Sequence, residues 1–439
     1  MTKSSRTRPG HRAAAGVIVT AISLAAGTAT APAADWPCWR GPDRNGISGE
    51  KGLDFASLKG GGDVLWTAEV GKGYSSVSVS RGRAFTMGSD GERERVIALD
   101  EATGRMLWDE SWPRKPSGGY PGPRATPVTD GTNVYAIGQF GDVVALDAAT
   151  GRTVWKANLE ADLGTQLPTW QYSGSPVIHG PLLLVNAGDG GGALNRSNGR
   201  KAWASKPGVC GYATPVVFAL DGRDLVAIFG EKALVVADAK TGAEYLRRPW
   251  ETEYDINAAD PVFDAGRLLA SSGYRTGTSL LDVRRQPSRV LWESKALRAQ
   301  FSSAVKIDGA VYGIDGNAGH GELVCLDLET GRERWRSGTG FGSLIAADGR
   351  LIVLNEKGEL IVAAADPAAF REEARARVLK GGVAWTPPAL ANGRLYARND
   401  GGALVCLRLG AIPAAGATSP HRPPTARPPS TRPPPGRPR

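Results

Sequence analysis

Hydrophobic and polar residues alternate over short stretches along most of the chain, and turn residues separate these stretches at a nearly regular spacing. Two clear examples are "RATPVTDGTNVYAIGQFGDVVALDAATGRTVW" and "FSSAVKIDGAVYGIDGNAGHGELVCLDLETGRERW". Each predicts a short strand, a two-residue turn, a second strand, a looser turn, a third strand ending near Asp, a "TG" turn and a fourth strand ending in Trp. The chain is therefore expected to consist of repeated units of four antiparallel strands.

The first turn of each unit gives the number of units. Its second residue is glycine at eight positions: Gly82, Gly131, Gly180, Gly222, Gly266, Gly309, Gly349 and Gly393. Asp or Asn precedes five of these glycines, as a tight hairpin with positive φ requires. Residues 35–410, divided among eight units, give 47 residues a unit, which is the size of a four-stranded propeller blade. The sequence thus predicts an all-β protein, an eight-bladed β-propeller of four-stranded antiparallel blades.

The fourth strand of most units ends in tryptophan. These residues are Trp108, Trp155, Trp203, Trp292 and Trp335. A large side chain that recurs once a blade is expected to pack between neighbouring blades. Two units differ from this pattern. Leu246 takes the tryptophan position in the fourth unit, and in the seventh "AADPAAFREEARARVL" replaces the turn and predicts a short helix.

The last unit lacks its fourth strand. Residues 386–409 supply three strands, whereas the orphan strand at residues 63–70, which carries Trp66, precedes the first unit. We expect this N-terminal strand to complete the last blade and close the propeller at residues 63–410. Closure would leave no open sheet edge, whose unpaired N–H and C=O groups would invite aggregation.

The stretch "DWPCWRGPDRNGIS" opens the segment before that strand. Because it precedes the closing strand, we expect residues 35–62 to form a clasp at the rim of the propeller, over the seam between the last and first blades. Trp36 and Trp39 are the expected buried anchors of this clasp.

The two ends of the chain explain its charge. Residues 1–34 combine four basic residues with an uncharged run and small residues near Ala33, which predicts a signal peptide and an exported protein, periplasmic or extracellular. Residues 411–439 form a Pro/Arg-rich segment that is expected to be a disordered tail. Of the net charge of +9, four charges lie in the first segment and five in the tail. The folded part is therefore nearly neutral, which argues against nucleic-acid binding, and no transmembrane span is expected in the mature chain.

Four isolated cysteines leave the disulfide state open. Export permits a Cys38 to Cys210 bridge, but the sequence cannot fix connectivity. Cys325 and Cys406 stand in strand-like "LVCL" runs and are expected to be small buried residues.

The eight-fold "TPV…DG…VY…ALD..TG…W" pattern resembles the PQQ-like (quinoprotein alcohol dehydrogenase-like) β-propeller family across residues 35–410. The opening "DWPCWRGPDRNGIS" is similar to an exported subgroup with a "WPxWRGPxRxG" start. That family contains both PQQ-dependent dehydrogenases and non-enzymatic BamB-type outer-membrane assembly factors, so the resemblance implies the fold but does not fix the activity.

The dehydrogenases of this family characteristically use two adjacent cysteines beside PQQ, and they hold Ca²⁺ through Glu and Asn side chains with an Asp as base. The chain has no adjacent cysteine pair. The nearest acidic cluster is "GIDGNAGHGE", with Asp315, Asn317 and Glu322 as weak metal candidates, and we interpret it as a solvated turn. No catalytic residue is assigned, and the residues that would hold a cofactor are unknown.

These observations favour a non-catalytic module of the cell envelope that binds a protein or peptide ligand, without a cofactor. The alternative is a PQQ- and Ca²⁺-dependent oxidoreductase with an atypical site. Carbohydrate binding is a third interpretation, supported by Trp112, Tyr120, Trp170 and Tyr172 in two long loops. The same aromatic residues could equally pack between loops.

Overall fold

The computed structural model describes residues 1–2, 34–115 and 118–412. The described residues from 34 onward belong to one compact unit, which contains all the sheets. The predicted signal peptide and Pro/Arg tail lie almost wholly outside the described residues. No helix in the described part of the chain is long and apolar enough to cross a membrane.

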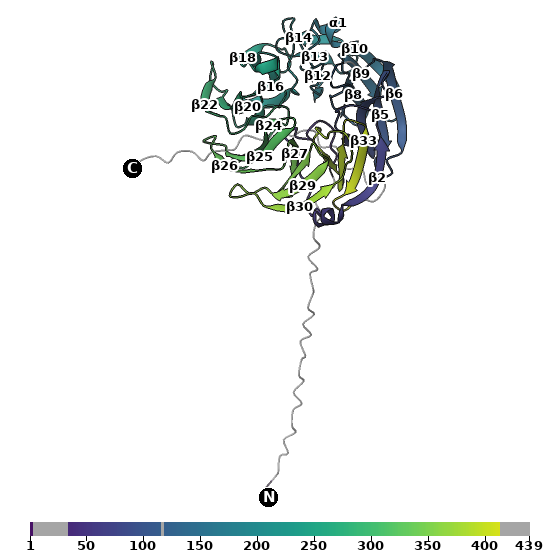
Figure 1. Cartoon of the computed structure of the whole chain (residues 1–439), viewed down its shortest axis with the longest axis vertical. Coiled ribbons are helices and arrows are strands. Elements are labelled where there is room, and N and C mark those ends of the chain that lie inside the picture. The colour runs from purple at the N-terminus through teal and green to yellow at the C-terminus, as the bar shows by residue number, and fades with distance from the viewer. Residues whose placement is uncertain (3–33, 116–117, 413–439) are drawn as a thin grey trace, which may run out of the picture. The chain divides into compact units, whose positions relative to one another are not determined.

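Eight blades of four antiparallel strands stand side by side in a closed ring (Figure 1), and the short β1 (Ile47–Ser48) adds a fifth, parallel strand to the seventh blade. This arrangement confirms the predicted eight-bladed β-propeller. The first four blades comprise β3 (Ser78–Ser80), β4 (Arg83–Ser89), β5 (Arg93–Asp100), β6 (Met106–Pro113); β7 (Val128–Thr129), β8 (Asn133–Ile137), β9 (Asp142–Asp147), β10 (Thr153–Asn158); β11 (Val177–His179), β12 (Leu182–Val185), β13 (Gly192–Asn195), β14 (Lys201–Ala204); and β15 (Val216–Leu220), β16 (Arg223–Phe229), β17 (Ala233–Asp238), β18 (Glu244–Pro249).

Blades five to seven comprise β19 (Val262–Asp264), β20 (Arg267–Ser272), β21 (Gly277–Asp282), β22 (Arg289–Ser294); β23 (Val305–Ile307), β24 (Ala310–Asn317), β25 (His320–Asp327), β26 (Glu333–Ser337); and β27 (Gly342–Ala347), β28 (Arg350–Asn355), β29 (Glu359–Ala364), β30 (Glu372–Arg377). Blade eight comprises β31 (Ala389–Ala391), β32 (Arg394–Arg398), β33 (Ala403–Arg408) and β2 (Asp63–Glu69). The remaining elements are β1 (Ile47–Ser48), the helix α1 (Leu159–Leu163) and two 3-10 turns at Ala56–Gly60 and Glu253–Asp255.

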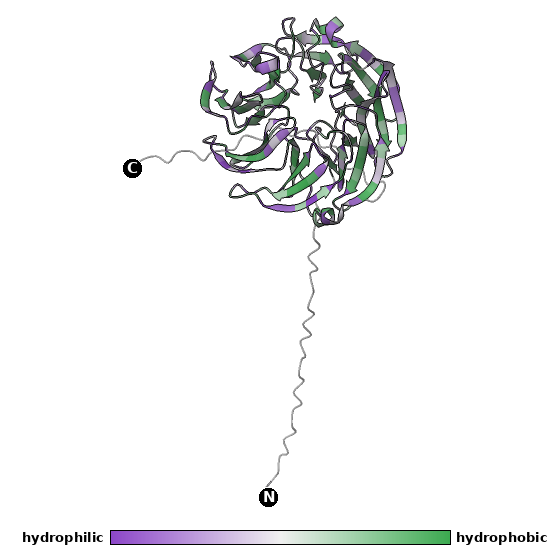
Figure 2. Cartoon of the chain, in the orientation of Figure 1, coloured by the Kyte–Doolittle hydropathy of each residue, from purple (hydrophilic) through white to green (hydrophobic). Residues whose placement is uncertain are grey.

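The core lies between neighbouring blades. In one apolar cluster, for example, Phe85 and Met87 of blade one pack with Val134 and Val144 of blade two. Hydrophobic residues run through the strands of the blades, while the outermost strands and the turns carry more hydrophilic ones (Figure 2). Each blade is thus stabilised mainly by burying its two faces against the next and previous blades.

The N-terminal strand β2 closes the ring, as predicted. It pairs antiparallel with β33, from Asp63 opposite Arg408 to Glu69 opposite Ala403. Next to this pair, the fully buried Arg398 of blade eight reaches into blade one. Its guanidinium donates to the carbonyl oxygens of Gly71, Gly73, Ser75 and Met87. The seam is therefore held by a strand pair and by one buried cation that satisfies backbone acceptors on the other side.

Tryptophan joins consecutive blades in a repeated way. The indole N–H of Trp155 in blade two donates to the carbonyl oxygen of Arg196 in blade three at 2.9 Å, and a Cβ on Gly199 of that turn would lie 2.5 Å from the indole. The same arrangement links Trp66 to Gly104, Trp108 to Gly151, Trp203 to Gly242 and Trp292 to Gly331. Each indole thus lies flat on a glycine turn of the following blade.

The fourth blade is an exception to this pairing. Leu246 faces Val236 after a bulge, in the place where Trp203 faces Ala193 one blade earlier. The turn that would receive an indole, residues 283–288 of blade five, contains no glycine. Glycine is not required at every such turn, since the indole N–H of Trp335 in blade six donates to the carbonyl oxygen of Asp366 in a turn of blade seven that also lacks glycine.

The predicted helix in the seventh blade is wrong. Residues 366–371 form an irregular connection, and Glu372–Arg377 form strand β30 against β29. Ala374 and Ala376 are buried while charged side chains alternate with them. This period of two is a strand pattern, and pairing with the open edge of β29 outweighs the helix propensity of Ala, Glu and Arg.

The clasp differs in extent from the prediction. Instead of staying at the rim, residues 36–54 cross one face of the ring and reach seven blades. Contacts are made to Val79, Thr129, Ile178, Asp260, Ala304, Ala346 and Gly393, which belong to blades one, two, three, five, six, seven and eight. Trp36 is buried, whereas Trp39 is only partly buried. All four cysteines are buried and free, so the structure has no Cys38 to Cys210 bridge.

We expect Trp155→Ala to lower the free energy of unfolding by about 3–5 kcal/mol, because it removes a large side chain from between two blades and leaves a cavity. Val154→Ala is the matched control, since Val154 is 43% exposed on the same strand, and it should change stability by less than about 0.5 kcal/mol. Chemical unfolding followed by far-UV circular dichroism measures both. Equal midpoints for the two variants would contradict the packing role of Trp155.

Candidate functional site

The loops that lead into the innermost strands of the blades, here called the inner loops, meet around the axis of the ring. In five inner loops, a side-chain hydroxyl or carboxylate accepts a hydrogen bond from the backbone N–H of the equivalent residue in the preceding blade. The bonds run from Ser76 to Thr126, Thr126 to Ser175, Ser175 to Thr214, Thr214 to Asp260 and Asp260 to Ser303, at 2.8–3.0 Å. This chain of hydrogen bonds fixes six inner loops in equivalent positions.

The residue two positions before each member of that chain faces the axis. These residues are Tyr74, Arg124, Ser173, Tyr212, Ala258 and Phe301, and all six line one pocket of about 220 Å³. The backbone at this position is therefore repeated by symmetry, while the side chain varies from blade to blade. Variation at a repeated, axis-facing position is how a propeller can build a specific site on a uniform scaffold.

Aromatic side chains make up most of the pocket wall. They are Trp39, Tyr74, Tyr120, Trp170, Tyr212, Tyr274, Phe301 and Trp385. Tyr74 and Trp385 are stacked, with ring centroids 5.5 Å apart and an interplanar angle of 19°. Trp385 also lies 5.5 Å from both Tyr120 and Phe301. Tyr74, Tyr120, Phe301 and Trp385 thus form one connected aromatic surface, which suits flat or apolar ligand groups.

The clasp supplies the floor of the pocket. Asp260 stands where other blades carry Ser or Thr, and its carboxylate accepts the indole N–H of Trp39 at 2.6 Å. The guanidinium of Arg40 lies 3.7 Å from the same carboxylate, and both side chains are buried. Burial raises the pKa of Asp260, and the charge of Arg40 and the Trp39 hydrogen bond oppose this shift. The fifth inner loop is thus specialised to hold the clasp across the channel.

Backbone strain is concentrated near the mouth of the pocket. Apart from the clasp and the first turn of each blade, the described residues with positive φ that are not glycine are Gln171, Tyr254, Asp255, Tyr274 and Arg275. Tyr274 lines the pocket, and its aromatic ring lies 5.2 Å from that of Tyr254, which is 60% exposed. Residues held in this conformation cost free energy, and they often occur at ligand sites.

The loop aromatics predicted from the sequence divide into two groups. Tyr120 and Trp170 line the pocket, with ring centroids 5.8 Å apart. Trp112 and Tyr172 are buried in the blade cores instead. Sequence reasoning missed Tyr74, Tyr212 and Phe301, although aligning the repeats at the inner-loop Ser/Thr would have found them as one variable column.

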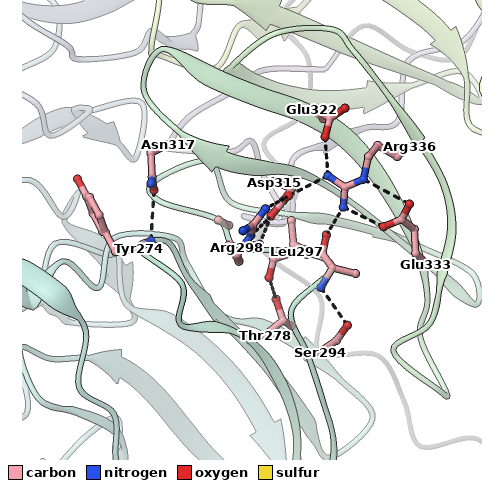
Figure 3. A network of polar contacts seen from close by, with 12 residues as sticks. Tyr274, Thr278, Ser294, Leu297, Arg298, Asp315, Asn317, Glu322, Glu333 and Arg336 are labelled. Carbon is pink, nitrogen blue, oxygen red and sulfur yellow. Dashed lines mark hydrogen bonds and ion pairs between the residues drawn. The ribbon is translucent and has the colours of Figure 1, made fainter.

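The acidic cluster does not form a solvated turn, which corrects the prediction (Figure 3). Asp315 lies on β24 and is 3% exposed. Its carboxylate accepts hydrogen bonds from the guanidinium groups of Arg298 and Arg336, and Glu322 also pairs with Arg336. Burial would raise the pKa of Asp315, but these arginines outweigh burial and lower it. Asn317 is separate and accepts the backbone N–H of Tyr274 at 3.3 Å.

The cluster is therefore an ion-pair network within blade six and the loop that leads into it. Its carboxylates face guanidinium groups rather than a common point, and the described residues contain no group of His, Cys, Asp and Glu that could hold a metal ion.

Residues 92–337 and 284–370 match the model of a family described as outer membrane protein assembly factor BamB. Among solved structures, BamB from Moraxella catarrhalis has a TM-score of 0.60 and 19% identity, and the match covers 79% of this chain and 99% of that chain. A search of the curated proteins finds no match to this sequence.

Two dehydrogenase structures are also similar. A europium-containing methanol dehydrogenase has a TM-score of 0.63 and 12% identity, covering 86% of this chain and 98% of that chain. A quinohemoprotein alcohol dehydrogenase from Comamonas testosteroni has a TM-score of 0.63 and 15% identity, covering 87% and 82%. At these identities the likeness shows the propeller fold alone.

The pairing of Asp260 with Arg40 can be tested by giving blade five the residue that other blades carry. Asp260→Ser keeps an acceptor for the N–H of Thr214 but leaves the buried Arg40 without its counter-ion. We expect it to cost about 3–5 kcal/mol of unfolding free energy. The double variant Arg40→Met, Asp260→Ser removes both charges and should recover most of the loss. Chemical unfolding measures this, and an Asp260→Ser variant as stable as the wild type would contradict the pairing.

Proposed function

This chain belongs to the PQQ-like propeller family whose model is described as outer membrane protein assembly factor BamB, and we propose that it is an exported, non-catalytic binding module of the cell envelope. It binds a protein or peptide ligand at the mouth of the channel and holds an apolar group of that ligand in the pocket. The proposal includes a signal peptide at residues 1–34 and a Pro/Arg tail at residues 411–439.

The observation that carries this proposal is the aromatic wall of the pocket, to which the variable position of the inner loops contributes Tyr74, Tyr212 and Phe301. Tyrosine and tryptophan offer large, rigid contact areas at small entropic cost, and they dominate the energetics of protein interfaces. The wall continues outward, since Tyr120 is 42% exposed and Tyr254 is 60% exposed. A ligand at the mouth can therefore contact exposed aromatic surface and insert one group into the pocket.

The family membership supports a protein ligand, because the matching family is named for an assembly factor. The hydrogen-bonded inner loops support a binding role as well. They hold the wall in one geometry before any ligand arrives, and a pre-organised site loses little entropy on binding.

The alternative function, a PQQ-dependent oxidoreductase, requires residues that fit the cofactor. PQQ is a planar tricarboxylate, yet the residues that line the pocket include one cation, Arg124. Their one carboxylate, Asp260, is already engaged by Trp39, Arg40 and the N–H of Thr214. One arginine cannot neutralise the three carboxylates of PQQ. The lining also lacks a group of unpaired carboxylate and amide oxygens that could bind Ca²⁺. The residues present do not fit PQQ with calcium.

A random peptide library displayed on phage tests the binding role. Peptides selected on the wild-type protein should bind with a Kd in the micromolar range or tighter. They should bind Trp385→Ala at least about tenfold more weakly, because an aromatic hot spot contributes about 2 kcal/mol or more. Leu291→Ala is the matched control, since Leu291 is an exposed apolar residue on the outer strand β22.

Three results would contradict this function. Selected peptides that bind Trp385→Ala and the wild type equally would place the ligand elsewhere. Saturable binding of PQQ and Ca²⁺ with dye-coupled alcohol oxidation would favour the oxidoreductase. Binding of oligosaccharides but not of peptides, lost in Trp385→Ala, would favour the carbohydrate interpretation.

A further inference from the structure

Arg124 is a cation without a carboxylate partner in an aromatic pocket. Among the residues that line the pocket it is the one lysine or arginine, and no ion pair to it occurs in the described part of the chain. Its guanidinium donates to two backbone carbonyls of its own loop, Tyr120 at 2.6 Å and Gly122 at 3.4 Å. The other five residues at this repeated position are uncharged.

Removing the Arg124 guanidinium from water without a counter-ion costs free energy in the protein without ligand. Burial lowers the pKa of Arg124 to about 10, so the side chain still carries its charge at neutral pH. The face of the Tyr74 ring, 5.8 Å from the guanidinium carbon, offsets part of the cost through a cation–π interaction. Arg124 is partly buried, and a partly buried cation without a counter-ion gains most from an anion that arrives with a ligand.

The nearby carboxylates form no ion pair with Arg124 in the described part of the chain. Asp260 on the pocket floor is paired with Arg40 and Trp39. Glu94 is near enough to attract Arg124 electrostatically, but its carboxylate accepts the backbone N–H of Gln139 at 2.9 Å and forms no ion pair with Arg124. The positive charge inside the pocket is therefore available to a ligand.

We propose that the channel pocket selects a ligand group with a single negative charge beside a flat apolar body. The guanidinium of Arg124 binds the anionic group, a carboxylate, sulfonate or phosphate. The apolar body lies against the stacked pair of Tyr74 and Trp385. This inference rests on the proposed binding role and adds the chemistry of the group that enters the pocket.

The recognition follows from the geometry of both partners. A guanidinium presents parallel N–H donors that match two anionic oxygens, so one arginine can orient one such group. The cavity of about 220 Å³ is adjacent to this donor and has room for an aromatic group of moderate size. The same chemistry is offered by a free organic acid and by an acidic group of a bound peptide.

Two dyes that differ by one charge test the proposal on the whole protein. The anionic dye 8-anilinonaphthalene-1-sulfonate and the neutral N-phenyl-1-naphthylamine share the same aromatic skeleton, and both fluoresce on binding. Arg124→Gln should weaken binding of the anionic dye by about 10- to 100-fold, the range expected for hydrogen bonds to a charged group. Its affinity for the neutral dye should change less than about twofold.

Two further variants separate charge from structure. Arg124→Lys keeps the charge but loses the planar donors, so it should bind the anionic dye with intermediate affinity. Arg105→Gln removes an exposed arginine outside the pocket and should change neither affinity. Unchanged binding of the neutral dye to Arg124→Gln also shows that this variant keeps the pocket intact.

The outcomes distinguish this inference from the proposed function. If Arg124→Gln weakens the binding of both dyes equally, or of neither, the pocket does not discriminate between charged and neutral ligands. The inference is then wrong, while the binding role stands. If the wild type binds neither dye, the pocket is not a ligand site and both fail. Displacement of the anionic dye by N-acetylphenylalanine, but not by its amide, supports a free acid. Displacement by an end-blocked Asp-Phe peptide, but not by its Asn-Phe counterpart, supports an acidic peptide.

Discussion

Closure of the ring is the constraint on which the rest of the structure depends. Each blade buries its faces against its neighbours, so a single open seam would expose two of them. The chain closes the seam without a covalent link, by pairing β2 with β33 and by extending Arg398 across to the carbonyls of blade one. The approach is tight: a Cβ on Gly88 would lie 1.8 Å from the carbonyl oxygen of Val70. Small residues and one long buried cation therefore decide whether the ring forms.

The channel site is a consequence of that closed ring. Because equivalent inner loops are tied to one another by hydrogen bonds from Ser76 round to Ser303, their preceding residues all face one axis. The repeated backbone places one residue of each of these loops beside the axis, and the type of side chain at that position differs from blade to blade. Five blades place an uncharged residue there and one places Arg124, so a repetitive fold acquires a polar, asymmetric pocket. The clasp turns the channel into a pocket by adding Trp39 as its floor.

The repeat made the fold predictable, because hairpin glycines and alternating residues are local signals that recur eight times. The site was harder, since it depends on which residues of distant blades share an axis. The tryptophans were recognised as packing residues, but their partners are glycine turns of the following blade, such as Gly199 for Trp155. From the sequence, Asp315 resembles a turn residue, because the two arginines that pair with its carboxylate, Arg298 and Arg336, lie in the loop before β23 and on β26. The sequence alone also could not distinguish helix from strand at residues 372–377, because pairing with β29 makes this segment the strand β30.

Native-state hydrogen exchange on the unmodified protein tests most directly whether the clasp is part of the closed ring. The amide of Trp36 donates to Val79 of blade one, and that of Asp54 donates to Leu409 at the end of blade eight. The account predicts that both amides exchange as slowly as those of the inner strand β32. Exchange of these two amides as fast as that of an exposed turn such as Gly381 would contradict it, and the pocket would then have no fixed floor.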